Sequence, residues 1–210
     1  KDLGLDATSA RVRRTTTQRA RVVKANKRRR IAAWLRRKDR RAAKLYKSNL
    51  WPATCYGISG NGMAPSTVRD LKAAAASVAL GAPGQCASTA VAMTLGSKMD
   101  PEISTRMTII KDWIWIWHNA SKEERIEAAR SWMQLKDKLK GNHKWRLVKG
   151  PIGATIATLH DLGWEPKFPD LWRSAEGDEY EIQDWQGDTI DEEMQFDLEA
   201  DLAKEIWDRA

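Results

Sequence analysis

The sequence predicts a mainly α-helical protein, with a long basic helix, helical hairpins and one small β-hairpin near residues 171–182. Helix-start signals such as Pro65, Pro101 and the pair Ser121 and Glu124 recur along the chain. Proline suits the first helical turn, and a Ser-x-x-Glu pair satisfies free N–H groups there. Glycines follow several apolar periodic segments, as they do at helix C-termini. Only one stretch has the short segments and turn residues of a hairpin.

The composition is that of a folded globular chain. Its 210 residues are 42% hydrophobic and 30% charged, which lies in the usual globular range. No apolar run approaches the ~20 residues that span a bilayer, since the best one, Ile109 to Trp117, is interrupted by Lys111 and Asp112. We therefore expect no membrane insertion. The chain starts on Lys1 and stops inside a helical pattern, so we expect it to be a segment of a larger polypeptide.

Charge is distributed very unevenly along the chain. Residues 1–50 contain 18 Lys and Arg against three Asp and Glu, residues 51–160 contain 14 against eight, and residues 161–210 contain four against 17. The overall formal charge of +8 hides this gradient. A chain polarised in this way binds polyanions at its basic end, folds its acidic end onto that basic end, or does both.

Residues 15–49 are expected to form one long basic helix. The run Thr15–Thr17 would cap its start, and Trp51 with Pro52 would end it. The alternative is that this helix breaks within Lys38–Arg41. Six apolar residues at helical spacing are expected to face the core as one narrow stripe. These residues are Ile31, Trp34, Leu35, Ala42, Leu45 and Tyr46.

Two helices are expected between residues 65 and 95. The first starts at Pro65, covers roughly Ser66–Leu80 and is closed by Gly81, the glycine that follows its C-terminus. The second is short and buried and covers Cys86–Leu95.

A helical hairpin is expected next. Its first helix opens at Pro101 and carries the run Trp113–Trp117. A half-buried strand would alternate apolar and polar residues, but all five residues of this run are apolar. A helix is therefore favoured. The capping box of Ser121 and Glu124 begins the second helix, which is expected to end at Gly141.

Residues 151–210 are expected to hold a short helix over Pro151–Leu162, a hairpin and a final acidic helix. The hairpin covers Leu171–Ile182 with its turn at Ala175–Asp178, and a second capping box at Thr189 begins the final helix. The elements then group into three regions. These are a basic helical region over 1–96, a Trp-rich helical hairpin region over 97–163, and an acidic hairpin-plus-helix region over 164–210.

The strongest functional signal is the arginine-rich N-terminal helix. So many cations on one helix repel one another unless a polyanion neutralises them. A nucleic-acid backbone does so through guanidinium–phosphate hydrogen bonds and counterion release. Solvation of the basic face, pairing with the acidic region 176–208, and docking on an acidic protein or membrane surface are the alternatives. The expected nucleic-acid-binding residues are Arg19, Arg21, Lys24, Lys27, Arg28, Arg29, Arg30, Arg36, Arg37, Lys38, Arg40, Arg41 and Lys44.

The chain has 11 tryptophans, and tryptophan is a residue type that favours interfaces. Trp113, Trp115 and Trp117 are expected to form a partner interface, because a run of five apolar residues makes a patch that monomers avoid. A place in the core and the stacking of bases are the other interpretations of this run.

No arrangement of catalytic residues or metal ligands stands out in the sequence. His118, His143 and His160 have no neighbouring ligands at metal spacing, and no serine or cysteine is ordered with a histidine and an acid. Acids such as Asp184 and Asp188 resemble loop and capping-box residues more than a metal site. We therefore expect no metal, no cofactor and no catalytic activity.

Several short blocks resemble the reverse transcriptases of non-LTR retrotransposons. Lys1–Gly4 is similar to a segment that follows the palm in these enzymes, and residues 18–25 (QRARVVKA) resemble their thumb-helix pattern. Leu50–Gly57 (LWPATCYG) is similar to their L-x-P-x-x-x-Y-G block, after which a helix ends near L-G, here Leu80–Gly81. Residues 162–172 resemble the linker before an RNase H-like domain in retroelement polyproteins of unicellular algae.

The resemblance implies that residues 1–96 form a thumb and connection region, C-terminal to the palm. The polymerase aspartates of the family would precede Lys1, so it implies template–primer or RNA binding without polymerisation. We expect the segment to grip RNA, or an RNA–DNA duplex, through its backbone and largely without sequence preference. One alternative is a retroelement fragment captured as a structural subunit of a large ribonucleoprotein, such as an organellar ribosome. The other is a protein-only scaffold whose basic helix docks on acidic partners. The sequence does not assign a compartment within the cell, whether the nucleus or an organelle.

Overall fold

The computed structural model describes residues 13–81, 91, 95–96, 99–182, 200–201 and 204. Within these residues the protein is mainly α-helical and has one small antiparallel sheet, as the sequence predicts. The expected short helix over Cys86–Leu95, except for two of its residues, lies outside the described part. Most of the final acidic helix lies outside it as well.

The chain divides into two compact units. Unit 1 contains residues 14–57 and 63–105, and unit 2 contains Arg13, residues 58–62 and the chain from Arg106 onward. The boundary in the sequence falls inside one helix, between Thr105 and Arg106. This division differs from the three regions expected from the sequence.

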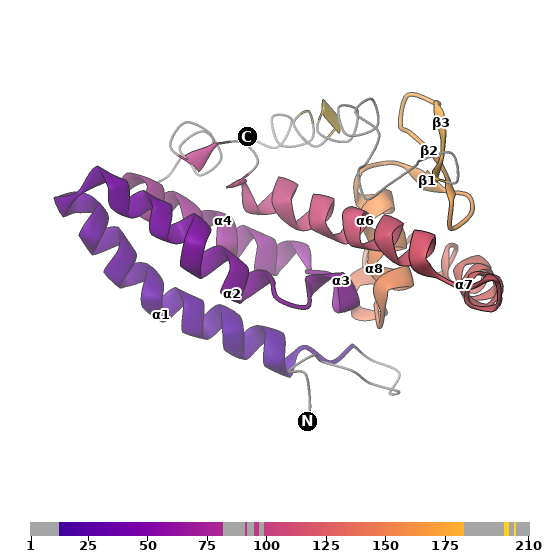
Figure 1. Ribbon diagram of the computed structural model, residues 1–210, viewed down its shortest axis with the longest axis horizontal. Coiled ribbons are helices and arrows are strands. Elements are labelled where there is room, and N and C mark those ends of the chain that lie inside the picture. Colours follow the sequence, from indigo (N-terminus) through magenta and orange to yellow (C-terminus); the bar gives the residue numbers. More distant parts are fainter. Residues whose placement is uncertain are drawn as a thin grey trace. The chain divides into compact units, whose positions relative to one another are not determined.

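Unit 1 is arranged around helix α1 (Thr16–Lys38), which packs along α4 (Pro65–Leu80) (Figure 1). Helix α1 starts directly after Thr15, as predicted, and helix α4 starts at Pro65 and ends before Gly81. Gly81 has a φ of +74°, which glycine adopts without strain, so this C-terminal signal is confirmed.

Within the stretch Lys38–Arg41, where the sequence allows a break, the long basic helix ends at Lys38 and breaks at Asp39. This residue is extended, and its carboxylate accepts a hydrogen bond from the backbone N–H of Arg41 at 2.9 Å. A 3-10 turn, η1 (Arg40–Ala43), a π-helical turn, η2 (Tyr46–Leu50), and helix α2 (Trp51–Cys55) follow. The sequence predicts that Pro52 ends a helix, and this prediction is wrong. Pro52 lies in the first turn of α2, where its missing N–H is not needed.

Small residues form the face of α1 that packs against the rest of unit 1. Ala32 belongs to a buried cluster with Ala75, Ala76 and Val78 of α4. Alanine faces let two helix axes approach closely, and large side chains would hold them apart. The expected stripe is therefore wrong for three of its members, which point to solvent. They are Ile31, Trp34 and Leu45, with exposed fractions of 62%, 56% and 37%.

Unit 2 contains most of a helical hairpin of α6 (Pro101–Asn119) and α7 (Lys122–Leu135). The predicted capping box joins them: the Glu124 backbone N–H donates to Ser121 Oγ at 3.3 Å, and the Ser121 N–H donates to the Glu124 carboxylate at 2.8 Å. Helix α7 ends at Leu135 and does not reach Gly141, because the chain goes on in turns from Lys136.

Unit 2 also contains three shorter helical segments. They are α3 (Ile58–Asn61), the 3-10 turn η4 (Lys144–Arg146) and α8 (Pro151–Asp161). Helix α8 packs against α3 and α7. It corresponds to the predicted helix over Pro151–Leu162, and Gly163 with a φ of +78° follows it.

The sheet of unit 2 has three antiparallel strands in the order β1 (Glu165–Pro166), β2 (Leu171–Arg173) and β3 (Glu179–Glu181). The hairpin of β2 and β3 is the predicted one, with Gly177 in its turn at a φ of +107°. Strand β1 was not predicted, because two residues carry no periodicity.

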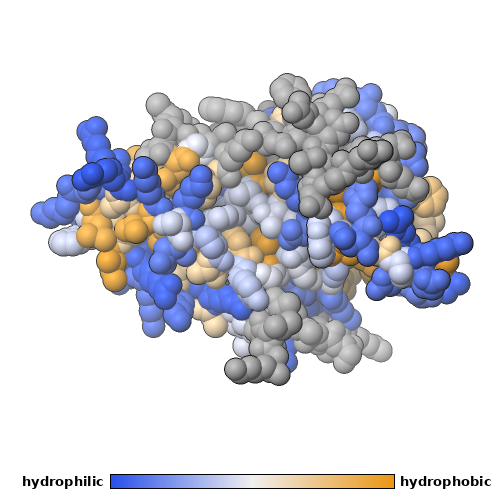
Figure 2. Space-filling model, in the orientation of Figure 1, coloured by the Kyte–Doolittle hydropathy of each residue, from blue (hydrophilic) through white to orange (hydrophobic). Residues whose placement is uncertain are grey.

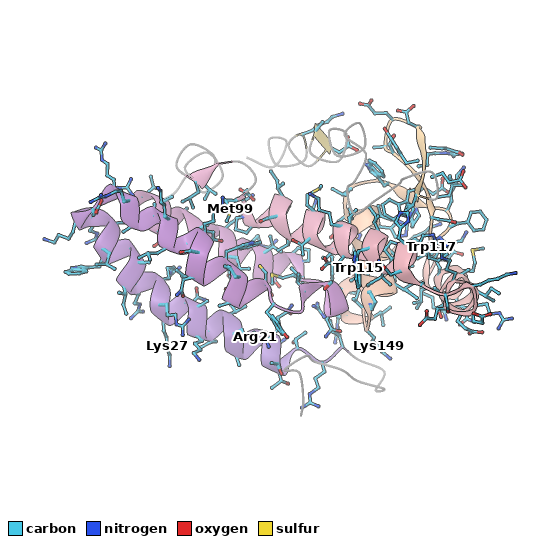
Figure 3. The ribbon with its side chains drawn as sticks, in the orientation of Figure 1. Arg21, Lys27, Met99, Trp115, Trp117 and Lys149 are labelled. Carbon is cyan, nitrogen blue, oxygen red and sulfur yellow. The ribbon has the colours of Figure 1, made fainter. Side chains whose placement is uncertain are left out.

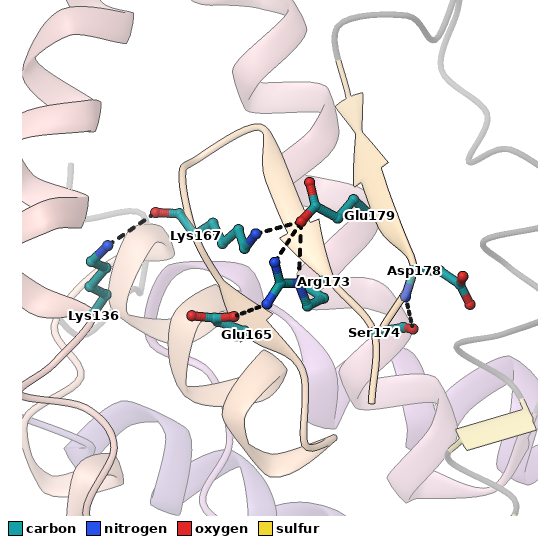
Figure 4. A network of polar contacts seen from close by, with 7 residues as sticks. All are labelled: Lys136, Glu165, Lys167, Arg173, Ser174, Asp178 and Glu179. Carbon is teal, nitrogen blue, oxygen red and sulfur yellow. Dashed lines mark hydrogen bonds and ion pairs between the residues drawn. The ribbon is translucent and has the colours of Figure 1, made fainter. Parts of the chain in front are cut away.

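Salt bridges tie the three strands together at the sheet surface (Figure 4). Arg173 of β2 reaches Glu165 of β1 at 3.4 Å and Glu179 of β3 at 2.8 Å. Lys167 also pairs with Glu179. Hydrogen bonds from Lys167 and Arg173 hold the pKa of Glu179 below its usual value.

Tryptophans fill the core between the helices and the sheet of unit 2. Trp113 and Trp132 are buried, with ring centroids 5.3 Å apart. The Trp113 indole N–H donates to the Pro169 carbonyl at 2.9 Å, and that of Trp132 donates to the Pro166 carbonyl at 3.1 Å. Each indole therefore fastens the chain around the sheet to the helical hairpin, with its polar group satisfied.

Candidate nucleic-acid interface

The segment from Arg14 to Gly57 contains 15 Lys and Arg and a single acid, Asp39. Arg41 binds that acid, with 3.0 Å between Nη2 and Oδ2, and its hydrogen bonds hold the pKa of Asp39 below its usual value. Helix α1 is 23 residues long. At 1.5 Å per residue it extends about 35 Å, the length of roughly ten base steps of B-form duplex.

The structure divides the 13 predicted nucleic-acid-binding residues into two groups. Five of them are bound inside unit 1. Arg21 donates to the Tyr56 carbonyl at 2.9 Å and lies 4.6 Å from the centre of that ring. Arg28 donates to the Asn49 side chain at 3.4 Å. Arg41 pairs with Asp39, as described above, and Arg36 and Arg37 bind helix α4.

Arg36 and Arg37 supply hydrogen bonds at the C-terminus of α4. The Arg36 Nε donates to the Ala79 carbonyl at 3.1 Å, and the Arg37 Nε donates to the Gly81 carbonyl. The last carbonyls of a helix lack partners within it and carry partial negative charge, so cations there are favourable. A Cβ at Gly81 would lie 3.1 Å from the Arg37 Cγ and 3.3 Å from the Arg36 Cγ, which shows how closely the two stems pack.

The other eight side chains form no hydrogen bond or ion pair with any residue that the structure describes. All of them are exposed except Arg29, which is half-buried. They are Arg19, Lys24, Lys27, Arg29, Arg30, Lys38, Arg40 and Lys44. We call these eight residues the free cations.

Four of the free cations share one side of α1. At 100° per residue, Lys24, Lys27, Arg30 and Lys38 fall on the side opposite the buried alanines of the helix. Figure 3 shows Lys27 on the side of α1 that is turned away from α4. A polyanion could therefore contact these four residues together without disturbing the packing of unit 1.

Large apolar residues interrupt this basic side, which the sequence interpretation missed. Ile31 and Trp34 are exposed there, and so is Val23, with 55% of its surface open. Figure 2 shows hydrophobic and hydrophilic side chains intermixed at the end of the molecule where α1 ends. The signal that could have revealed this is the spacing of Val22, Ala25, Ala32 and Ala33, which predicts a buried face on the opposite side.

The expected partner interface on α6 needs correction. Trp113 and Trp117 are only 2% and 6% exposed, because α6 packs them into the core of unit 2 beside Trp132. Trp115 points away from that core and is 54% exposed. Residues two apart on a helix point to opposite sides, whereas residues four apart share a side. Trp115 therefore points away from Trp113 and Trp117, and the three rings cannot form one surface. Only Trp115 stays available to a partner.

Within the described residues, no group of three or more His, Cys, Asp or Glu side chains could hold a metal ion. The acids near Asp184 and Asp188 lie outside the described part of the chain. No described helix combines the length and the apolar character that crossing a bilayer requires.

Comparison of the chain with protein-family models, with curated proteins and with solved structures gives no significant match.

Proposed function

We propose that unit 1 binds a nucleic-acid backbone, with RNA as the principal ligand, through the free cations of α1 and the turns after it. The observation that carries this proposal is the eight cations without a partner among the described residues, in a segment that holds one acid. Such a surface repels itself until phosphates neutralise it and release their counterions.

The division of the cations gives the proposal a structural mechanism. Arg36, Arg37 and Arg21 hold α1 against α4 and Tyr56, and six of the eight free cations lie on that fixed helix. Lysine and arginine contacts to phosphate position a strand but carry no base information. Binding is therefore largely independent of sequence, and the segment needs no catalytic group of its own.

One contact also supports the reverse-transcriptase-like interpretation as a proposal. Arg21, in the block of residues 18–25, binds both the carbonyl and the ring of Tyr56, in the block of residues 50–57. Two blocks that resemble the same family at the sequence level thus meet in one unit. We propose that they form a thumb-like surface for a template–primer or an RNA strand.

The test is the salt dependence of RNA binding by the 210-residue chain. In the triple variant Lys24→Glu, Lys27→Glu, Arg30→Glu, we expect weaker binding to unrelated RNA sequences by about the same factor. For single strands each phosphate contact contributes about 0.7 to the slope of log K against log salt, so the slope magnitude should fall by about 2. Fluorescence anisotropy at several salt concentrations measures both quantities.

The matched control is Lys122→Glu, Lys138→Glu, Lys149→Glu. These three exposed lysines belong to unit 2, have no partner among the described residues, and change the net charge by the same amount. Equal losses in the two triple variants would contradict the proposal, because the charge of the whole chain would then be responsible. A slope magnitude below about 2 for the unaltered chain would contradict it too, since only two or three phosphates would be neutralised.

A further inference from the structure

We propose that α1 prefers single-stranded nucleic acid, because an unpaired base stacks on Trp34 while the cations beside it bind the adjoining phosphates. This inference rests on the proposed function and adds the class of ligand. In a duplex the bases are stacked on one another, and their faces are closed to a side chain. A single strand offers both its bases and its phosphates.

The geometry begins with a row of residues along the exposed side of α1. Val23, Lys27, Ile31, Trp34 and Lys38 follow one another at intervals of four, four, three and four residues. Residues at these intervals lie one above another on a helix, about 4.5–6 Å apart along its axis. Two cations, Lys27 and Lys38, thus lie among three apolar side chains along one line. Arg30 and Lys24 flank this line on its two sides.

The ring of Trp34 is open to a ligand. Among the tryptophans that the structure describes, only Trp34 and Trp115 are exposed. Trp113, by contrast, is buried, with its ring centroid 5.3 Å from that of Trp132 and its indole N–H donating to the Pro169 carbonyl. Trp34 makes no aromatic or cation–π contact with a described residue, although arginine and lysine occur at neighbouring helical positions. No described side chain of unit 1 therefore occupies the face of the Trp34 indole ring, where a base would stack.

The surroundings of Trp34 select the kind of ligand. Arg30 stands four residues before the ring and Lys38 four residues after it, so a cation lies about 6 Å along the axis on either side. A nucleotide chain presents a flat base next to a charged phosphate, which matches a ring next to a cation. An amphipathic protein helix or a lipid surface would need an unbroken apolar face. Lys27 and Lys38 interrupt that face here.

The deciding variant is Trp34→Leu in the 210-residue chain, measured with an unstructured 20-nucleotide RNA and with a 20-base-pair RNA duplex. Stacking of one base on an aromatic side chain corresponds to a loss of about 5- to 150-fold when the ring is removed. We expect that loss for the single strand, with the duplex affinity and the salt slope unchanged. Trp34→Phe should recover most of the affinity, because it restores a ring.

Trp115→Leu is the matched control, since Trp115 is equally exposed but stands on α6, away from the free cations in sequence. It should bind both ligands like the unaltered chain. A strand that contains 2-aminopurine gives a direct signature of stacking. Its fluorescence should be quenched on binding to the unaltered chain and to Trp34→Phe, and much less on binding to Trp34→Leu.

The outcomes separate this inference from the proposed function. If Trp34→Leu binds the single strand normally while Lys24→Glu, Lys27→Glu, Arg30→Glu reduces the salt slope, the stacking is overturned and backbone binding stands. If Trp34→Leu weakens single strand and duplex equally, the selectivity is overturned. If it instead abolishes binding to phosphatidylserine vesicles and leaves RNA affinity intact, the occupant is a membrane surface and the inference is wrong.

Discussion

The Arg36 Nε of α1 donates a hydrogen bond to the carbonyl oxygen of Ala79, in the last turn of α4, at 3.1 Å. This contact places a guanidinium where helix α4 has carbonyls without partners. The cations of α1 therefore serve two purposes. Some of them hold the two helices together, and the free cations face solvent.

Arg36→Ala should lower the free energy of unfolding by about 1–2 kcal/mol, because a charged hydrogen bond to a helix end is lost. Lys27→Ala should change it by less than about 0.5 kcal/mol, since Lys27 is exposed and has no partner among the described residues. The order should be opposite for RNA affinity, which only Lys27→Ala weakens. Urea unfolding followed by circular dichroism, together with RNA titration, measures both. Equal effects of the two variants on stability would contradict this division of the cations.

Ser121→Ala should destabilise unit 2 by about 1 kcal/mol, because the N-cap of α7 loses its side-chain acceptor. The effect should be smaller below pH 4. The hydrogen bonds with Ser121 hold the pKa of Glu124 below its usual value, so this contribution is present above the unfolded pKa and lost as pH falls through the folded one. Ser66→Ala is the control, since Ser66 is exposed and has no hydrogen-bond partner in the described chain. A loss at Ser66 as large as that at Ser121 would refute the capping role.

Unit 2 should lose stability as pH falls from 7 toward 5 because of His160. Burial lowers the pKa of this imidazole, whose Nε2 lies 3.1 Å from the Lys136 carbonyl at the C-terminus of α7. A histidine with a lowered folded pKa contributes stability above its unfolded pKa of about 6.5, and this contribution is lost as pH falls through the folded pKa. His160→Gln should flatten the pH dependence of the urea midpoint in this range. His143→Gln, at an exposed position, should not. An unchanged pH profile in His160→Gln would show that another group titrates.

Trp113→Phe should lower the stability of unit 2 by about 1–3 kcal/mol. The change removes the hydrogen bond to the Pro169 carbonyl, leaves that carbonyl buried without its donor, and shrinks the ring beside Trp132. Trp115→Phe should have little effect, because that ring is exposed. Thermal unfolding followed by near-ultraviolet circular dichroism reports on the tryptophan cluster. A similar small shift for both variants would mean that Trp113 contributes little to the core.

Local signals predicted most of the helices correctly. Pro65 and Gly81 bracket α4, the Ser121–Glu124 capping box starts α7, and Pro151 starts α8. These signals succeed because each one acts on a particular backbone group at a helix end. A capping side chain gives a free N–H a hydrogen-bond partner, and a proline in the first turn has no N–H that needs one. The run Trp113–Trp117 was correctly placed on a helix, although its alternation also suggests a strand.

The faces of the helices could not be predicted in the same way, because they depend on the partner. Ile31 and Trp34 have the residue types of a core, but α4 offers alanines, and a close alanine contact leaves no room for them. The same reasoning applies to Arg36, which has the appearance of a nucleic-acid contact in the sequence and becomes a helix cap in the fold. Charge alone does not tell a free cation from a bound one.

The alanine face between α1 and α4 also affects the thermodynamics of binding. Alanine loses no rotamer freedom when it is buried, so α1 is held in place by a contact that orders few side chains. The helix axis is then preorganised before any ligand arrives, and only the exposed lysine and arginine side chains have to be ordered. The main entropic penalty of complex formation falls on the nucleic acid. A flexible strand can adjust its phosphate spacing to this fixed template, whereas a stiff ligand binds only where its own spacing already agrees.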